Sequence, residues 1–152
     1  IGSFAVIAVR ERELGENVTL ENIRGWAWSR PVLGAAMTVF LLSLAGFPLT
    51  GGFLAKLLVF GAAVQSGWTW LAIVGAVTTV ISLGYYLRIG MAMYDRGHVE
   101  GAALRPAKGM AMASLAAVVG VVAVLWLGIY PVAALDWARD AAGTVVALAS
   151  GQ

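Results

Sequence analysis

The stretch LAGFPLTGGFLAK, residues 44–56, stands in the middle of an apolar segment that runs from residue 31 to residue 67. One continuous helix over this segment would be about 55 Å long, whereas the hydrocarbon core of a bilayer is about 30 Å thick. Pro48 disfavours helical backbone at the residue before it and has no backbone N–H to donate, and glycines stand on both sides of it. The segment is therefore predicted to break between Gly46 and Gly52.

The break divides the segment into two predicted helices, at 32–46 and 52–66, joined by an irregular link at 47–51. Each helix would be roughly 22 Å long. Two arrangements fit this length: two short or tilted spans, or one helix interrupted within the membrane. Irregular backbone at membrane depth persists only beside protein or a watery cavity. The sequence leaves both arrangements open.

Lys56 is the only charged side chain between Pro31 and Leu87. A charge at the centre of a bilayer costs about 2.5–3.5 kcal/mol on insertion scales, so such residues usually belong to an ion or proton pathway. Burial disfavours the ammonium form, and a lysine in this setting can release and take up a proton. The alternative is a lysine that snorkels to a membrane face about 6–8 Å away.

Several residues around the break are candidates for lining a proton path to this lysine. The break frees backbone groups, and the hydroxyls of Ser43 and Thr50 could hold ordered waters, as broken helices do in transporters. Gly46, Pro48 and Gly52 shape the break itself. They fit a functional hinge and a simple tight turn equally well.

Composition places the chain in the membrane class. Of its 152 residues 61% are hydrophobic and 12% are charged, whereas about a quarter of the residues of a typical soluble domain are charged. The formal net charge is only +2 and the basic residues are scattered, so no nucleic-acid partner is expected. The absence of cysteine excludes disulfides and cysteine-ligated metal centres in this chain, and no metal site is expected. We predict an all-α, polytopic transmembrane helix bundle.

Further spans follow from the other apolar runs. Residues 1–9 are expected to be the end of one span that leaves the membrane at Arg10-Glu11-Arg12-Glu13, and 68–94 and 109–130 are expected to be complete spans. All the predicted transmembrane helices thus lie within residues 1–131. The tail 132–152 carries charges at helical spacing on an otherwise apolar stretch, which predicts an amphipathic interfacial helix.

Tyr86 and Arg88 belong to a polar cluster near the end of the 68–94 span, with Ser82 and Tyr85. One interpretation is an interfacial anchor in which Arg88 snorkels to the headgroups. The other is a polar network that leads protons toward the pathway, with Tyr86 as a lining residue. The charge distribution does not determine which end of this span faces the cytoplasm.

The start of the chain does not look like a natural beginning. The first residue is Ile1 rather than Met, and no signal peptide follows it. We expect the chain to be the C-terminal piece of a longer membrane protein, with a processed N-terminus as the alternative.

Two motifs resemble a known family. Residues 38–56, TVFLLSLAGFPLTGGFLAK, resemble the SLAGIP-x-TxGFxxK signature of the antiporter-like subunits of respiratory complex I. Residues 80–88, VISLGYYLR, are similar to the SLYYYLR segment of one subunit type in that family. Multi-subunit sodium/proton antiporters share the first motif, so that motif identifies only a superfamily. The second motif indicates one subunit type within it. Phe47 and Gly84 depart from the family pattern. Gly84 stands where the family segment has the first of its three tyrosines.

The resemblance covers roughly residues 1–131 and implies an antiporter-like fold of two inverted repeats. This chain would be the C-terminal portion of the second repeat. The lysine that the family carries on a discontinuous helix maps onto Lys56. The partners in the first repeat, a glutamate and further lysines, would lie upstream, so a complete proton path cannot be built from this chain alone.

By the same resemblance we expect a proton-translocating membrane subunit, part of a translocase that couples electron transfer from NADH to quinone to proton pumping in the bacterial inner (plasma) membrane. The chain itself would hold no cofactor, redox centre or active site, while NADH, FMN, iron–sulfur clusters and quinone would bind to other subunits. Its partners would be the other membrane subunits of complex I and the lipid bilayer. Two alternatives remain: a subunit of a sodium/proton antiporter or membrane-bound hydrogenase, and a structural membrane subunit without its own proton path.

Overall fold

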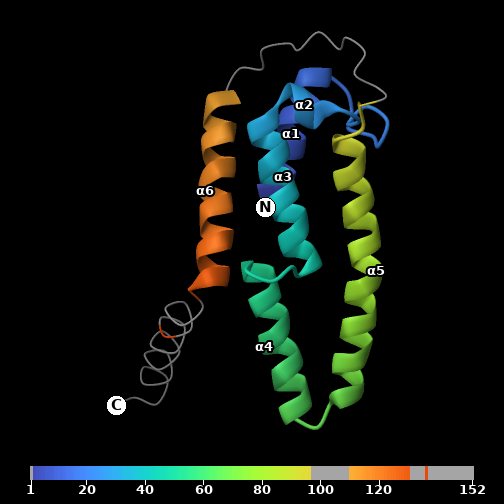
Figure 1. Ribbon diagram of the computed structural model, residues 1–152, viewed down its shortest axis with the longest axis vertical. Helices are drawn as coiled ribbons and strands as arrows, with labels where there is room; N and C mark the ends of the chain where they lie inside the picture. Colours follow the sequence, from blue (N-terminus) through green and yellow to red (C-terminus); the bar gives the residue numbers. More distant parts are fainter. Residues whose placement is uncertain (1, 97–109, 131–135, 137–152) are drawn as a thin grey trace, which may run out of the picture.

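The computed structural model describes residues 2–96, residues 110–130 and Asp136, and within them every regular element is a helix (Figure 1). This confirms the predicted all-α class. The helices are α1 (Gly2–Leu14), α2 (Trp26–Ser29), α3 (Pro31–Ala45), α4 (Gly51–Gln65), α5 (Thr69–Met93) and α6 (Met110–Ile129).

The long apolar segment forms one helix interrupted at the predicted place. Pro31 occupies the first turn of α3, where its missing N–H is not needed, and Gly46 ends that helix with a φ of 85°. The link covers residues 46–50, one residue earlier than expected at each end. Beyond the link α4 continues away from α3 instead of folding back beside it (Figure 1). Of the two arrangements that the sequence leaves open, the structure has the interrupted helix.

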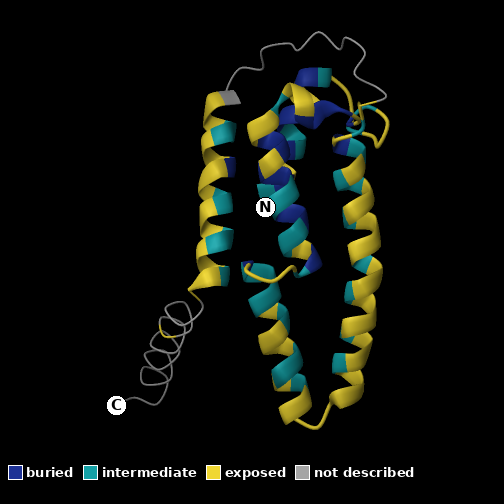
Figure 2. Cartoon of the chain, in the orientation of Figure 1, coloured by how far each residue is buried: buried dark blue, intermediate teal, exposed yellow. Residues whose placement is uncertain are grey.

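Helix α3 is the centre of the bundle. It contacts α1, α5 and α6, and the core forms where these helices meet, around Met37, Phe40 and Ala117. Below the break, α4 and the first half of α5 form a hairpin whose surface is largely exposed (Figure 2). The break therefore lies where a packed half of the molecule meets an unpacked half.

Two helices are long and apolar enough to cross a membrane by length and composition, at Thr69–Met93 and Ala111–Ile129. Helices α3 and α4 are shorter, with 15 residues each, and together make up the interrupted helix. The predicted amphipathic tail at 132–152 lies outside the described residues except for Asp136, which is helical and exposed.

One expectation about the end of the first helix is wrong. Arg10 and Glu13 do not leave the bundle into water, because α1 continues through them to Leu14. Both are buried, with relative exposures of 6% and 5%. The apolar face that begins at Val6 runs on through these two charged side chains at helical spacing, and the polar segment that follows folds over them.

Candidate functional site

The last four carbonyls of α3 have no partner within the helix, and two of them accept hydrogen bonds from backbone N–H groups just after it. The N–H of Phe47 donates to the carbonyl of Leu42 at 2.9 Å, and the N–H of Gly46 donates to that of Ser43 at 3.0 Å. This pair of bonds is the Schellman motif, which requires the left-handed conformation that Gly46 supplies. The carbonyls of Leu44 and Ala45 are left over, because the last four carbonyls of a helix have no partner within it.

Lys56 satisfies these two remaining carbonyls. Its Nζ lies 2.9 Å from the carbonyl oxygen of Leu44 and 3.0 Å from that of Ala45. The lysine reaches them from the second turn of α4, so one side chain joins the two halves of the interrupted helix. A Cβ at Gly46 would lie 3.0 Å from Cδ and 3.2 Å from Nζ of Lys56, so the glycine also makes room for this approach.

The electrostatics of the break favour a cation at this point. The C-terminal end of a helix carries a partial negative charge, and the ammonium lies directly against that end of α3. An ammonium group has three N–H donors, of which the two carbonyls use two. Lys56 is only half-buried in this chain. The arrangement can therefore hold a charged lysine and still leave one of its protons available to a further acceptor.

Ser43 and Gly52 bring α3 and α4 into close contact. The backbone N–H of Gly52 donates to Oγ of Ser43 at 3.2 Å. A Cβ at Gly52 would lie only 1.9 Å from the carbonyl oxygen of Ser43, so no other residue fits here without moving the two helices apart. Both are predicted site residues, and the structure brings them together with Lys56 at the break.

Thr50 and Pro48 belong to the turn itself. Oγ1 of Thr50 is buried and donates to the carbonyl oxygen of Phe47 at 2.7 Å, so this hydroxyl closes the turn rather than facing Lys56. Pro48 is exposed. A Cβ at Gly128 of α6 would lie 2.2 Å from the carbonyl oxygen of Leu49, which shows how closely α6 packs on the link.

Tyr86 lies on the α5 side of a groove of about 280 Å³ between α3 and α5, which Lys56 does not line. The groove also reaches Ala45, whose carbonyl binds Lys56. The ring of Tyr86 packs on the core and lies 4.3 Å, centroid to centroid, from that of Tyr85. The structure thus places Tyr86 near the end of α3 but gives it no bond to the lysine.

A cavity of about 430 Å³ lies between α1, α3 and α6 and ends at the break. Its walls are mostly apolar, but they include the hydroxyls of Ser3 and Ser43. Leu44, whose carbonyl binds Lys56, also lines it. Water can occupy a cavity of this size where polar groups offer it partners. The cavity therefore reaches the end of α3 from the side of α1, although Lys56 itself does not line it.

A second polar cluster, which the sequence did not predict, is centred on Glu13. The Glu13 carboxylate accepts hydrogen bonds from Nε1 of Trp26 and Nε of Arg30, each at 2.9 Å, and its Oε2 lies 3.6 Å from Nη1 of Arg10. Arg10 also donates to the carbonyl oxygen of Asn22 and lies over the ring of Trp26. The i, i+3 spacing of Arg10 and Glu13 on the face of Val6 was the signal that could have revealed it.

Burial shapes the chemistry of this cluster. It lowers the pKa of the Arg10 guanidinium below its ordinary value, and the neighbouring Glu13 carboxylate acts in the opposite direction. An arginine nevertheless stays charged. The cluster is therefore a permanent ionic tie between α1, the polar segment and the start of α3. Among the described residues, no group of His, Asp or Glu side chains is placed to hold a metal ion.

Comparison with known proteins gives consistent results. The profile of a family described as NADH:quinone oxidoreductase/Mrp antiporter, TM, matches residues 1–82. Over 138 residues the chain is 41% identical to NADH-quinone oxidoreductase subunit N of Salinibacter ruber, which covers 86% of this chain and 28% of that protein. Over 145 residues it is 39% identical to subunit N of Myxococcus xanthus, with 93% of this chain and 28% of that protein covered.

A third relative, subunit N 1 of Herpetosiphon aurantiacus, is 38% identical over 145 residues, which are 95% of this chain and 29% of that protein. The chain therefore spans less than a third of the length of these relatives. Subunit N is also the subunit type whose SLYYYLR segment residues 80–88 resemble.

Proposed function

Because the chain belongs to the NADH:quinone oxidoreductase/Mrp antiporter transmembrane family, we propose that it is part of a proton-translocating membrane subunit of an NADH–quinone oxidoreductase. The names of the relatives favour this enzyme over a sodium/proton antiporter or a hydrogenase. One observation carries the proposal: a single lysine amine lies against the open carbonyl end of an interrupted helix, in an otherwise uncharged segment.

Lys56 is the proton-carrying group of the proposal. When protonated, it is held by the carbonyls of Leu44 and Ala45 and by the negative end of α3. When it gives up a proton, this electrostatic attraction falls while its two remaining N–H groups can still reach both carbonyls. Because the neutral amine is attracted less strongly to the end of α3, it can leave these carbonyls for other hydrogen-bond partners more easily than the ammonium can. Loss and gain of the proton therefore bias the position of the side chain, which is what a carrier between two sides requires.

Protons would reach Lys56 through the cavity that ends at Ser43. The hydroxyl of Ser43 stands between that cavity and the break, where it already accepts from the N–H of Gly52. Hydroxyls and waters can pass protons along such a line of hydrogen bonds. Thr50 and Tyr86 are lesser candidates, because the first is engaged in the turn and the second lies across the groove.

The rest of the machinery would lie outside this chain. We propose that NADH, FMN, iron–sulfur clusters and quinone bind to other subunits, and that further antiporter-like and small membrane subunits are its neighbours. The upstream portion of the same protein would complete the proton path. The membrane would be the bacterial inner membrane.

Lys56→Arg and Lys56→Ala, made in the intact complex, test the proposal. Arginine keeps a charged donor for both carbonyls but does not readily deprotonate, so Lys56→Arg should assemble normally and move fewer protons per NADH oxidised. Lys56→Ala should show the same loss of pumping together with a weaker joint between α3 and α4. Leu57→Ala, which shortens the next, exposed side chain of α4, is the matched control. Proton uptake by inverted membrane vesicles and native gel electrophoresis provide the two readouts.

The same pair of variants separates proton transfer from a purely structural role. If Lys56→Arg pumps like the unaltered complex, the lysine is only a cap for α3 and the proposal fails. If Lys56→Ala assembles and pumps normally, the chain is a scaffold at this position. Either result would move the proton path to another part of the subunit.

A further inference from the structure

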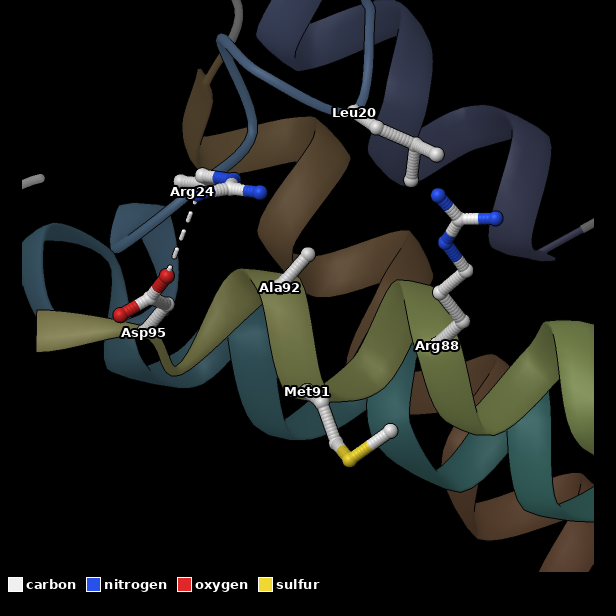
Figure 3. A pocket seen from close by; sticks show the side chains of 6 residues that line it. All are labelled: Leu20, Arg24, Arg88, Met91, Ala92 and Asp95. Atoms are coloured by element: carbon white, nitrogen blue, oxygen red, sulfur yellow. Dashed lines mark ion pairs between the residues drawn. The ribbon is translucent and has the colours of Figure 1, made fainter. Parts of the chain in front are cut away.

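A cationic pocket opens at the C-terminal end of α5. It has a volume of about 380 Å³ and is lined by Leu20 and Arg24 from the polar segment and by Arg88, Met91, Ala92 and Asp95 (Figure 3). The polar segment is held over α5 by the bond from the N–H of Gly25 to the carbonyl oxygen of Ala92, at 3.2 Å. The pocket is therefore built from two parts of the chain that are far apart in sequence.

The charges in this pocket do not cancel. Arg24 and Asp95 form a loose ion pair at 3.6 Å, and their side chains are 44% and 43% exposed. Arg88 stands apart from that pair, with its guanidinium directed toward Leu20 (Figure 3). Within the described part of the chain Arg88 makes neither a hydrogen bond nor an ion pair. One positive charge with five N–H donors thus has no anion among the residues that the structure describes.

An apolar groove begins beside the pocket. It is the groove of about 280 Å³ between α3 and α5, and its walls include Leu41, Leu83 and Leu87. Met91 lines both the pocket and the groove, so the two are adjacent across this side chain. A cationic pocket that continues into an apolar groove matches a molecule with an anionic head and a hydrocarbon tail.

Aromatic side chains place the pocket at the depth of lipid headgroups. The indole N–H of Trp28 donates to the carbonyl oxygen of Tyr94 at 3.0 Å, and the two rings meet edge to face with centroids 5.9 Å apart. The guanidinium of Arg96 lies 4.2 Å from the centroid of the Trp28 ring. Tryptophan and tyrosine gather at the boundary between membrane and water, where their polar tips meet the headgroups. Arg88, about one and a half turns from the end of α5, lies just inside that boundary.

We propose that this pocket and groove bind one phospholipid with an anionic headgroup. The phosphate pairs with the guanidinium of Arg88, whose planar fork fits two phosphate oxygens. Arg24 remains with Asp95, and an acyl chain crosses Met91 into the groove. A lipid with one net negative charge neutralises the pocket, whereas a zwitterionic lipid leaves the positive charge of Arg88 uncompensated. The charged end of the site, at Arg88, contains neither Lys56 nor its two carbonyl partners, and its test does not depend on the proposed proton path.

Lipid retention in the intact complex tests this proposal. The complex is exchanged into nanodiscs of phosphatidylcholine that contain phosphatidylglycerol as a minor component, and the lipids that remain bound are counted by native mass spectrometry. Arg88→Ala should weaken phosphatidylglycerol binding about 10-fold, since it removes a charged hydrogen-bonding partner. Arg12→Ala is the matched control, because Arg12 is an exposed arginine on a helix end that does not line the pocket.

A second variant tests the groove independently of the charge. Nothing lies within 4 Å of a Cβ at Gly90, which lines the groove, so a side chain can start there without a clash, and Gly90→Leu takes up space that the acyl chain would use. It should reduce phosphatidylglycerol retention while Arg88 stays in place. Equal retention of phosphatidylglycerol and phosphatidylcholine would overturn the proposal. The proposal would also be overturned if millimolar inorganic phosphate displaced phosphatidylglycerol equally well in the unaltered complex and in Gly90→Leu. The pocket would then be a site for free phosphate.

Discussion

Gly52→Ala is expected to separate α3 from α4 at the break and to destabilise the subunit by about 3 kcal/mol or more, at the upper end of the usual cost of overpacking. The added methyl carbon would lie 1.9 Å from the carbonyl oxygen of Ser43, and that oxygen belongs to the backbone of α3. No change of rotamer relieves such a contact. The two helices must move apart, which also stretches the bonds from Lys56 to Leu44 and Ala45.

The matched control for this prediction is Gly61→Ala on the same helix. Nothing lies within 4 Å of a Cβ at Gly61, so the same chemical change should leave stability unchanged or raise it by up to about 1 kcal/mol through helix propensity. Thermal dissociation of the purified complex, followed by native gel electrophoresis, measures both variants. Equal dissociation temperatures for Gly52→Ala and Gly61→Ala would show that the break tolerates more space than this packing provides.

The break was predictable because its causes are local. Pro48 and the glycines around it disfavour a continuous helix whatever lies nearby, and the apolar segment is longer than a bilayer is thick. The position of Lys56 on α4 follows from the same reading. The partner of its amine did not follow, because the pairing depends on which carbonyls the Schellman bonds of Gly46 and Phe47 leave free.

The Glu13 cluster was missed because its cause is not local. Four charges in a row after an apolar run normally mark an exit into water, and Glu11 and Arg12 do face outward. Arg10 and Glu13 are buried only because residues more than ten positions later, Trp26 and Arg30 among them, return to cover them. Sequence spacing places two charges on the apolar face of α1, but the identity of the covering residues comes from the fold.

Glu13→Ala is expected to cost about 3–5 kcal/mol, because removal of one partner of a buried ion pair leaves the other charge uncompensated. Arg10, which is buried at 6% exposure, would then lack its counter-ion, and the indole N–H of Trp26 would lose its acceptor. Arg30 is less affected, since its side chain is 25% exposed and can turn to water. The polar segment 15–25 should open first, which hydrogen exchange in the intact complex would report as faster exchange in that segment.

Glu11→Ala is the matched control, because Glu11 lies on the exposed face of the same helix and its truncation should leave the exchange unchanged. The double variant Arg10→Met, Glu13→Leu separates charge from packing. If the uncompensated guanidinium is the cause, replacing both charges by apolar side chains of similar size should recover most of the loss. If the double variant is as unstable as Glu13→Ala, the hydrogen bonds from Trp26 and Arg30 to Glu13 hold the segment in place, and the ion pair with Arg10 contributes little. Exchange as slow in Glu13→Ala as in Glu11→Ala would contradict the prediction outright, because the segment would then be held without this cluster.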